Sequence, residues 1–393
     1  MIWWAAMSQA KQKRAPTEEM QPAAIMAYFS AVPDPRIERS RLHPLPSILV
    51  LSLLAVICGA DSFVAIEQFG KGKEGWLRTF LDLPNGIPSH DTLGRVFAML
   101  DPKALTEAFR GWMADVTKLT NGGVVAIDGK TLRRSFREPG IGFVHMVSAW
   151  SAQNRVVLAQ VKTEEKSNEI TAIPRLLKLL AIQGCTVTID AMGCQKDIAK
   201  EIVDGGAEYL LAVKDNQPTL AADIAAVFEE ARQDPEALAR MRFHETREKG
   251  HGRTEVRRCW TTSALDHITQ RDQWERLSTL VLVESERTVN GKTTLEHRHY
   301  ISSQSFLSPE QALEHSRSHW GIENGLHWVL DIAFREDECR VRAGNAAENL
   351  AVMRHLALNM LKAVKGTKVG IQNRRLRAGW DHDFLFQVLG ALS

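Results

Sequence analysis

The sequence predicts an α/β protein built on a mixed sheet flanked by helices, with a helical domain in front and a mostly β insertion. Three observations predict this class. Up to residue 118, apolar residues recur at helical spacing and no strand pattern interrupts them. From Gly122 onward, short apolar runs alternate with helical segments. Between Asp215 and about Phe306, that alternation breaks into a helix and two hairpin-like pieces.

The composition is that of a multidomain protein, and its net charge does not indicate a particular binding partner. The 393 residues suggest two or three domains, and 49 Lys and Arg against 47 Asp and Glu leave a net charge of only +2. Any polyanion partner must therefore be recognised by local charge. Five scattered cysteines, with no CxxC pair and no secretory signal ahead of them, favour a reducing cytoplasm.

The first domain, residues 21–118, is expected to be helical after a disordered start over residues 1–20. Its apolar run "ILVLSLLAVICGA" is shorter than the ~20 residues that a bilayer span requires, so we predict a buried core helix and no membrane partner. In "IPSHDTLGRVFAMLD", Ser89 fits a helix cap, and Arg95 lies opposite the apolar face. That helix is either a DNA-reading helix or, more commonly, an ordinary packed one.

The second unit, residues 119–218 and 306–366, alternates strands and helices. "VVAID", "FVHMVSAWSA" and "RVVLAQVKT" predict a three-strand meander, and a helix, the strand "CTVTIDA", another helix and the strand "EYLLAVK" follow. The insertion, residues 219–305, has turns at "KGHGR" and at Asn290-Gly291. The chain then returns to helices, and residues 367–393 form a basic C-terminal segment.

Carboxylates at strand ends are the main candidates for chemistry. Asp128 ends the first strand of the meander, and Asp190 ends the strand after the first helix. On neighbouring strands they could share a hard divalent cation such as Mg²⁺, although either aspartate alone is more typical of a loop cap. We expect the third carboxylate from Glu323 in "HWGIENGLHWVLD", with Asp331 or Glu336 as alternatives.

Histidines accompany that third acid on one helical stripe. His319, Glu323 and His327 lie at intervals of four residues, which places them on the same face of a regular helix. Each histidine is more typical of a hydrogen-bonded, partly buried side chain than of a metal ligand. Clustered Cys and His ligands at zinc spacings are missing from the sequence, so a zinc site is not favoured.

Several segments together resemble a known family. "AIDGKTLRRS", "VTIDAMGCQKDIA", "YLLAVKDNQPTL", "HGRTEVR" and "HWGIENGLHWVLDIAFREDECRVR" resemble the H-repeat-associated transposases of bacterial insertion sequences, in the DDE superfamily with an RNase H-like core. "VPDPRIERSRLHPLPSILVLSLLAVICGADSF" resembles the helical domain that precedes this core. The likeness runs from about residue 25 to residue 390.

The resemblance implies a function and a set of site residues. Asp128, Asp190 and Glu323 would hold two Mg²⁺ ions, for which Mn²⁺ can substitute, and the enzyme would cut element ends and join the 3′-OH to target DNA. Paired ends imply a homodimer on double-stranded DNA. Relatives carry Tyr, Arg and Lys around the third acid, where this chain has Ser316, His319 and Leu330. Those supporting roles are therefore unassigned.

Basic and amide side chains near these acids are predicted to contact DNA, although each alone is equally typical of a solvated loop. The predicted contacts are Lys130, Arg133, Arg134, Lys214, Asn216, Gln217, Arg253, Arg257, Arg317, His319, Arg340 and Arg342, with Arg374, Arg375 and Arg377 extending the basic surface. Two alternatives to a cytoplasmic, nucleoid-associated transposase remain. One is an RNase H-like nuclease that cuts without joining, and the other is a domesticated DNA-binding descendant without activity.

Overall fold

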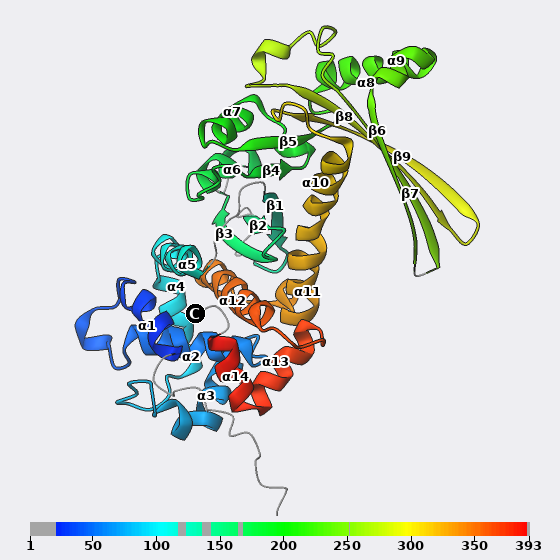
Figure 1. Ribbon diagram of the computed structural model, residues 1–393. Helices are drawn as coiled ribbons and strands as arrows, with labels where there is room; N and C mark the ends of the chain where they lie inside the picture. Colours follow the sequence, from blue (N-terminus) through cyan, green and yellow to red (C-terminus); the bar gives the residue numbers. More distant parts are fainter. Residues whose placement is uncertain (1–20, 117–122, 136–142, 164–167, 251, 391–393) are drawn as a thin grey trace, which may run out of the picture.

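The computed structural model describes residues 21–116, 123–135, 143–163, 168–250 and 252–390, and the predicted disordered start lies outside them. A lobe of helices lies at one end of the molecule, the core sheet lies in the middle, and a long arm of strands projects from the other end (Figure 1). Helix α10 (Pro309–Ile322) runs between the arm and the lobe, alongside the core sheet.

The core sheet confirms the predicted fold class. Strands β1, β2 and β3 form an antiparallel meander, while β1, β4 and β5 are parallel, in the spatial order β3-β2-β1-β4-β5. This order and polarity are those of an RNase H-like core. The strands span β1 Val124–Leu132, β2 Val144–Ser151, β3 Val156–Lys162, β4 Thr186–Ile189 and β5 Glu208–Val213.

The insertion is joined to this sheet. We expected residues 219–305 to form a subdomain, but β9 pairs antiparallel with β5, so all nine strands form one sheet. Its four strands extend away from the core as the arm (Figure 1). They are β6 Arg242–Gly250, β7 Arg253–Thr262, β8 Thr279–Val289 and β9 Lys292–Ser302, preceded by helices α8 Pro218–Gln233 and α9 Pro235–Arg240.

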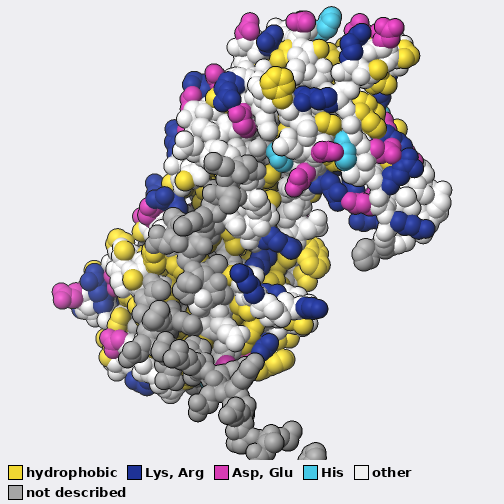
Figure 2. Space-filling view, in the orientation of Figure 1, with side chains coloured by type: hydrophobic (Ala, Val, Ile, Leu, Met, Phe, Trp, Pro, Cys, Tyr) yellow, Lys and Arg dark blue, Asp and Glu magenta, His cyan; other side chains and the backbone are white. Residues whose placement is uncertain are grey.

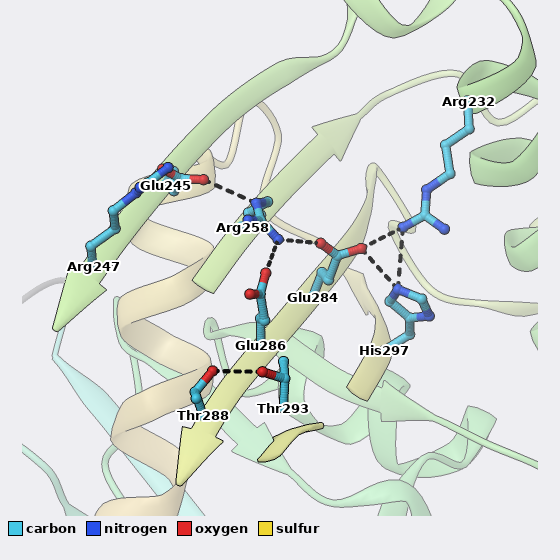
Figure 3. A network of polar contacts seen from close by, with 9 residues as sticks. All are labelled: Arg232, Glu245, Arg247, Arg258, Glu284, Glu286, Thr288, Thr293 and His297. Atoms are coloured by element: carbon cyan, nitrogen blue, oxygen red, sulfur yellow. Dashed lines mark hydrogen bonds and ion pairs between the residues drawn. The ribbon is translucent and has the colours of Figure 1, made fainter. Parts of the chain in front are cut away.

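Ion pairs link the strands of the arm to one another. Arg258 on β7 bonds Glu245 on β6 at 2.9 Å and Glu284 on β8 at 2.8 Å, and Glu284 also accepts from Arg232 of α8 (Figure 3). A strand ribbon with few apolar neighbours gains order from such cross-strand pairs. The network therefore fixes the arm to the helix at its base.

Helices cover both faces of the core. Helices α6 (Glu169–Leu177) and α7 (Lys196–Asp204) pack on one face, and α10 and α12 (Ala346–Ala363) pack on the other. A π turn over Glu323–His327 joins α10 to α11 (Trp328–Phe334). Asp128 projects toward the face covered by α10.

The lobe combines the first and the last helices of the described residues. Its central helix α2 is buried over almost its whole length, as predicted for the apolar run. The segment Glu38–Ile57 is long and apolar enough to cross a bilayer, but 72% of its apolar 18-residue stretch is buried inside the protein. The lobe helices are α1 Gln21–Ser30, α2 Leu45–Ile57, α3 Phe63–Leu77, α4 His90–Met99, α5 Pro102–Val116, α13 Ile371–Trp380 and α14 His382–Leu389.

One expectation for the C-terminal segment is wrong. Arg375 was expected on a basic surface, but it is 2% exposed and donates to the carbonyls of Val56 and Ala333 and to Asp61. Its guanidinium joins α13 to α2 and α11, because five donors in a planar group can satisfy several buried acceptors at once.

The lobe and the core are joined at the end of α4. Asn349 of α12 donates to the carbonyls of Phe97 at 2.8 Å and Leu100 at 3.0 Å, and the Asn345 amide donates to Ala98 at 2.9 Å. These bonds satisfy the carbonyls that a helix end leaves open. Gly344 has φ +49° here, and a Cβ at this position would lie 2.9 Å from the Ala98 carbonyl carbon.

Candidate active site

Two strand-end aspartates lie on adjacent parallel strands. Ile127 of β1 is paired with Ile189 of β4, so Asp128 and Asp190 follow in register and leave the same face of the sheet. The Asp128 carboxylate accepts from the Gly129 amide at 2.9 Å. Asp190 caps the short 3₁₀ turn Ala191–Gly193, accepting from the Gly193 amide at 3.4 Å.

Glu323, the predicted third acid, lies in the π turn. We expected an unbroken helix through Glu323, but α10 ends at Ile322 and the π turn follows. His327 Nδ1 lies 3.7 Å from Glu323 Oε2 and 3.4 Å from Asp128 Oδ2. The wider turn therefore aims His327 between the two carboxylates. Single π turns of this kind occur often at functional sites.

Asp128, Glu323 and His327 form a cluster with the geometry of a metal site. Their ligand atoms all lie within 4.8 Å of one another, and within the described parts of the chain this is the one group of three that meets this test. Asp190 is on the neighbouring strand but is not part of that group. The sequence placed His327 on the stripe of Glu323 but gave it no role in the site, and the four-residue spacing was the available signal for its place in this cluster.

Burial controls the charge of the cluster. It raises the pKa of Asp128 to about 7; the neighbouring His327 opposes this rise and the Glu323 carboxylate adds to it. The neighbouring imidazole of His327 lowers the pKa of Glu323, against the effect of burial. His327 Nε2 is buried without a hydrogen-bond partner. Asp128 and His327 are largely buried, while the Glu323 side chain is 50% exposed. Two acids and an imidazole that meet at such a site favour a bound cation, because the cation would compensate the charge of the acids.

Two contacts hold the π turn in place. Gly325 faces the buried ring of Trp150, where a Cβ would lie 2.9 Å from Cζ2. Lys362 of α12 donates to the Gly325 carbonyl, and its Nζ lies 4.0 Å from the centre of the same ring. A cation over an aromatic face is attracted to it. The turn is thus fixed on the side opposite Glu323.

The two alternative acids have another partner. Lys130 Nζ pairs with Asp331, with Glu336 at 2.9 Å and with Asp337 at 3.7 Å. Burial would raise the pKa of Glu336, but the charges of Lys130 and Arg354 outweigh it and lower that pKa to about 2. Asp331 and Glu336 therefore neutralise Lys130 and lie outside the cluster. Lys130 is only 11% exposed, so the structure gives it a structural role where we predicted a DNA contact.

The predicted DNA contacts near Asp128 lie mostly at the surface. Arg133 is 79% exposed and 3.2 Å from Asp337, and Arg134 is exposed, with its carbonyl accepting from Arg342 Nε at 2.9 Å. Arg340 is exposed on the same loop as Arg342. The structure thus brings Arg134 and Arg342 together.

Residues that follow β5 hold the turn after Asp190. Asn216 donates to the Ala191 carbonyl at 2.6 Å, and Gln217 donates to the Cys194 carbonyl at 3.0 Å. Lys214 is exposed and lines a cavity of about 390 Å³ with Asp190. Asn216 and Gln217 therefore have backbone partners, and Lys214 is the one of the three that faces solvent with its charge.

His319 and the predicted cations of the arm are engaged with protein groups. His319 Nδ1 lies 3.3 Å from Thr188 Oγ1, and burial lowers its pKa. Arg317 reaches Glu248 on β6 at 2.7 Å. Arg257 also pairs with Glu248, at 3.1 Å, and Arg253 lies 3.2 Å from Glu255. Arg317 therefore connects α10 with the arm.

Comparisons with known proteins fit this architecture. Residues 120–360 match the family described as "Transposase DDE domain", and residues 26–113 match "DDE_Tnp_1-associated". The chain is 39% identical to "H repeat-associated putative transposase YhhI" of Escherichia coli (strain K12), over 94% of this chain and 98% of that protein. It is 41% identical to "Putative transposase YncI" of Escherichia coli O157:H7, over 94% and 95%.

One solved structure is similar at low identity. It is a piggyBac transposase synaptic complex with hairpin DNA, with a TM-score of 0.43 and 13% identity, covering 93% of this chain and 81% of that one. The fold assignment rests on the strand order and polarity described above.

Proposed function

Because this chain belongs to the DDE transposase family, we propose that it is the transposase of a bacterial insertion sequence, acting on double-stranded DNA in the cytoplasm. It would cut the ends of its element and join the 3′-OH to target DNA. The observation that carries the proposal is the meeting of Asp128 and Glu323, with His327 between them, from segments far apart in the chain. Paired element ends would bring two copies of the chain together.

A divalent metal ion fits the donor atoms at this site. The DDE transposase domain implies divalent metal use, and we propose Mg²⁺, or Mn²⁺ in its place, held by Asp128, Glu323 and Asp190 as two ions. When bound, the ions supply an activated water and stabilise charge on the leaving oxygen. His327 suits Mn²⁺ better than Mg²⁺ as a ligand, and with either ion it orients the two carboxylates.

The chain's own residues support that site in distinct ways. Trp150 and Lys362 fix the π turn that carries Glu323, and Asn216 and Gln217 fix the turn that follows Asp190. We assign phosphate contacts to the exposed cations, because these contacts need accessible charge and little else. The exposed cations are Arg133, Arg134, Lys214, Arg340 and Arg342.

Metal affinity should depend on pH. Asp128 must lose its proton to bind a cation, and its pKa is raised to about 7, so Mn²⁺ affinity should rise about tenfold per pH unit below 7 and level off above it. Calorimetric titration between pH 6 and pH 8 measures this. Glu323→Gln should weaken Mn²⁺ binding strongly. The matched variant Asp331→Asn should leave it unchanged; a loss in that variant would make Asp331 the ligand.

Joining distinguishes the proposal from its alternatives. Purified protein is incubated with Mg²⁺, duplexes that carry the element ends and a supercoiled target plasmid, and the products are separated on gels. Cleavage followed by joined products supports the transposase. Cleavage without joining would identify a nuclease, and binding without cleavage would identify a DNA-binding descendant. Each of these two outcomes overturns the proposal.

A further inference from the structure

A second cavity lies on the opposite side of the π turn from the acid cluster. Its volume is about 450 Å³, and we call it the back pocket. The turn between β2 and β3, the π turn, α11 and the segment between α12 and α13 all contribute to its walls. The residues used below are Arg155, Trp328, Ile332, Lys362, Val369 and Arg374.

The back pocket carries positive charge without acidic partners. Arg155, Lys362 and Arg374 line it, and none of its described lining residues is Asp or Glu. Lys362 donates to the Gly325 carbonyl, and Arg374 donates to the carbonyls of Leu361 and Thr367, each at 2.6 Å. Carbonyls satisfy hydrogen bonds but carry no net charge, so they do not compensate the charge of Arg374, or that of Lys362 when it is protonated. A partly buried, uncompensated charge is costly, so an anion here would be stabilised.

The charges act on one another. Burial, and then the positive charge of Arg155, lower the pKa of Lys362 to about 7. An anion between Arg155 and Lys362 would raise the pKa of Lys362 again. In Figure 2, dark blue Lys and Arg side chains gather where α11, α12 and α13 meet, with yellow hydrophobic side chains beside them.

Exposed apolar side chains form the other part of the pocket. Trp328 is 60% exposed, Ile332 58% and Val369 45%. Exposed apolar side chains indicate a binding site when they lie next to one another. Here they line the same cavity as the cations. An aromatic ring beside basic side chains is the arrangement that binds single-stranded nucleic acid, by stacking a base and neutralising its phosphate.

We propose that the back pocket binds a single strand of DNA, with a phosphate between Arg155 and Lys362 and a base stacked on Trp328. This inference rests on the proposed function, since it names a further DNA contact of the same enzyme. The bound strand would also reach the acid cluster indirectly. Lys362 holds the Gly325 carbonyl of the turn whose other side carries Glu323 and His327, so an anion on Lys362 would strengthen that support.

Strand binding can be measured without catalysis. The probe is a fluorescein-labelled single strand of mixed sequence, followed by anisotropy with metal-free protein at several salt concentrations. The double variant Arg155→Ala/Trp328→Ala should bind at least about tenfold more weakly, since one stacked base and one phosphate contact are removed. Both side chains are exposed, so the fold should persist, as thermal unfolding would show.

A matched control removes the same residue types elsewhere. Arg39→Ala/Trp380→Ala deletes an exposed arginine and an exposed tryptophan outside the pocket and should bind like the parent protein. If both double variants lose the same affinity for the strand, the effect comes from general surface charge and the inference is overturned. Unchanged strand binding by Arg155→Ala/Trp328→Ala would also overturn it. If the parent protein binds the strand through the pocket but never cuts or joins DNA, the proposed function fails and the pocket stands.

Discussion

Replacing Asp128 with Asn is expected to lower strand cleavage and joining by about a thousandfold, the upper range for losing one group that stabilises charge in a transition state. Asn keeps the size of the side chain but removes the negative oxygen that a metal ion requires. Single-turnover cleavage of a labelled element-end duplex measures the loss. Asp82→Asn, at an exposed aspartate of the lobe, should retain parent activity.

The same substitution should not weaken the fold. The pKa of Asp128 is raised to about 7, so in the absence of metal its ionisation makes the folded state less stable as pH rises from about 4 to 7. Asn cannot ionise, and the variant should therefore be at least as stable as the parent at pH 8. Retained activity, or a variant that unfolds more readily than the parent at this pH, would contradict the role of Asp128 as a buried ligand.

Lys130→Met is expected to reduce the free energy of unfolding by about 3 kcal/mol, since removing one partner of a buried ion pair leaves the other charge uncompensated. Glu336 is 2% exposed on its side chain and would keep only Arg354, at 3.4 Å. Urea unfolding measures the change. Arg133→Met is the matched control: Arg133 contacts the same Asp337 as Lys130 but is 79% exposed, so its loss should cost less than about 1 kcal/mol.

The effect of Lys130 should also depend on pH. The pKa of Glu336 is lowered to about 2, so its contribution to stability is fully present above the pKa of an unfolded glutamate and is lost as pH falls toward 2. The stability gap between parent and Lys130→Met should therefore be constant from pH 5 to pH 7 and should shrink below about pH 4.5. If Lys130→Met is as stable as the parent at pH 7 and binds DNA more weakly, Lys130 contacts DNA, as predicted from the sequence.

Local patterns in the sequence were sufficient for much of the fold. The apolar runs that end at Asp128 and Asp190 are local signals, and parallel pairing in register then brings these residues to one edge of the sheet. The pairing of β9 with β5 was not predictable in this way, because it joins strands separated by the whole insertion. The alternation within β9 is the same whether its partner is the core or another strand of the arm.

The site shows a similar division. The sequence suggested Glu323 as the third acid, and the structure places it beside Asp128. The π turn depends on Trp150 and Lys362, which belong to other elements, so helical spacing could not predict where His327 points. Lys130 next to Arg133 looks like one basic loop in the sequence. Alternation along a strand sends Lys130 inward to acids that lie some 200 residues further along the chain, as the separations of 201 and 206 show.

The pairing of β9 with β5 makes the arm and the core mechanically continuous. Hydrogen bonds run without interruption from the outermost strand, β6, through β5 to β4, the strand that leads to Asp190. A force applied at the tips of the arm would therefore be transmitted through the sheet to the edge at Asp190. A partner that binds the arm would be coupled to the position of the Asp190 carboxylate through main-chain hydrogen bonds alone.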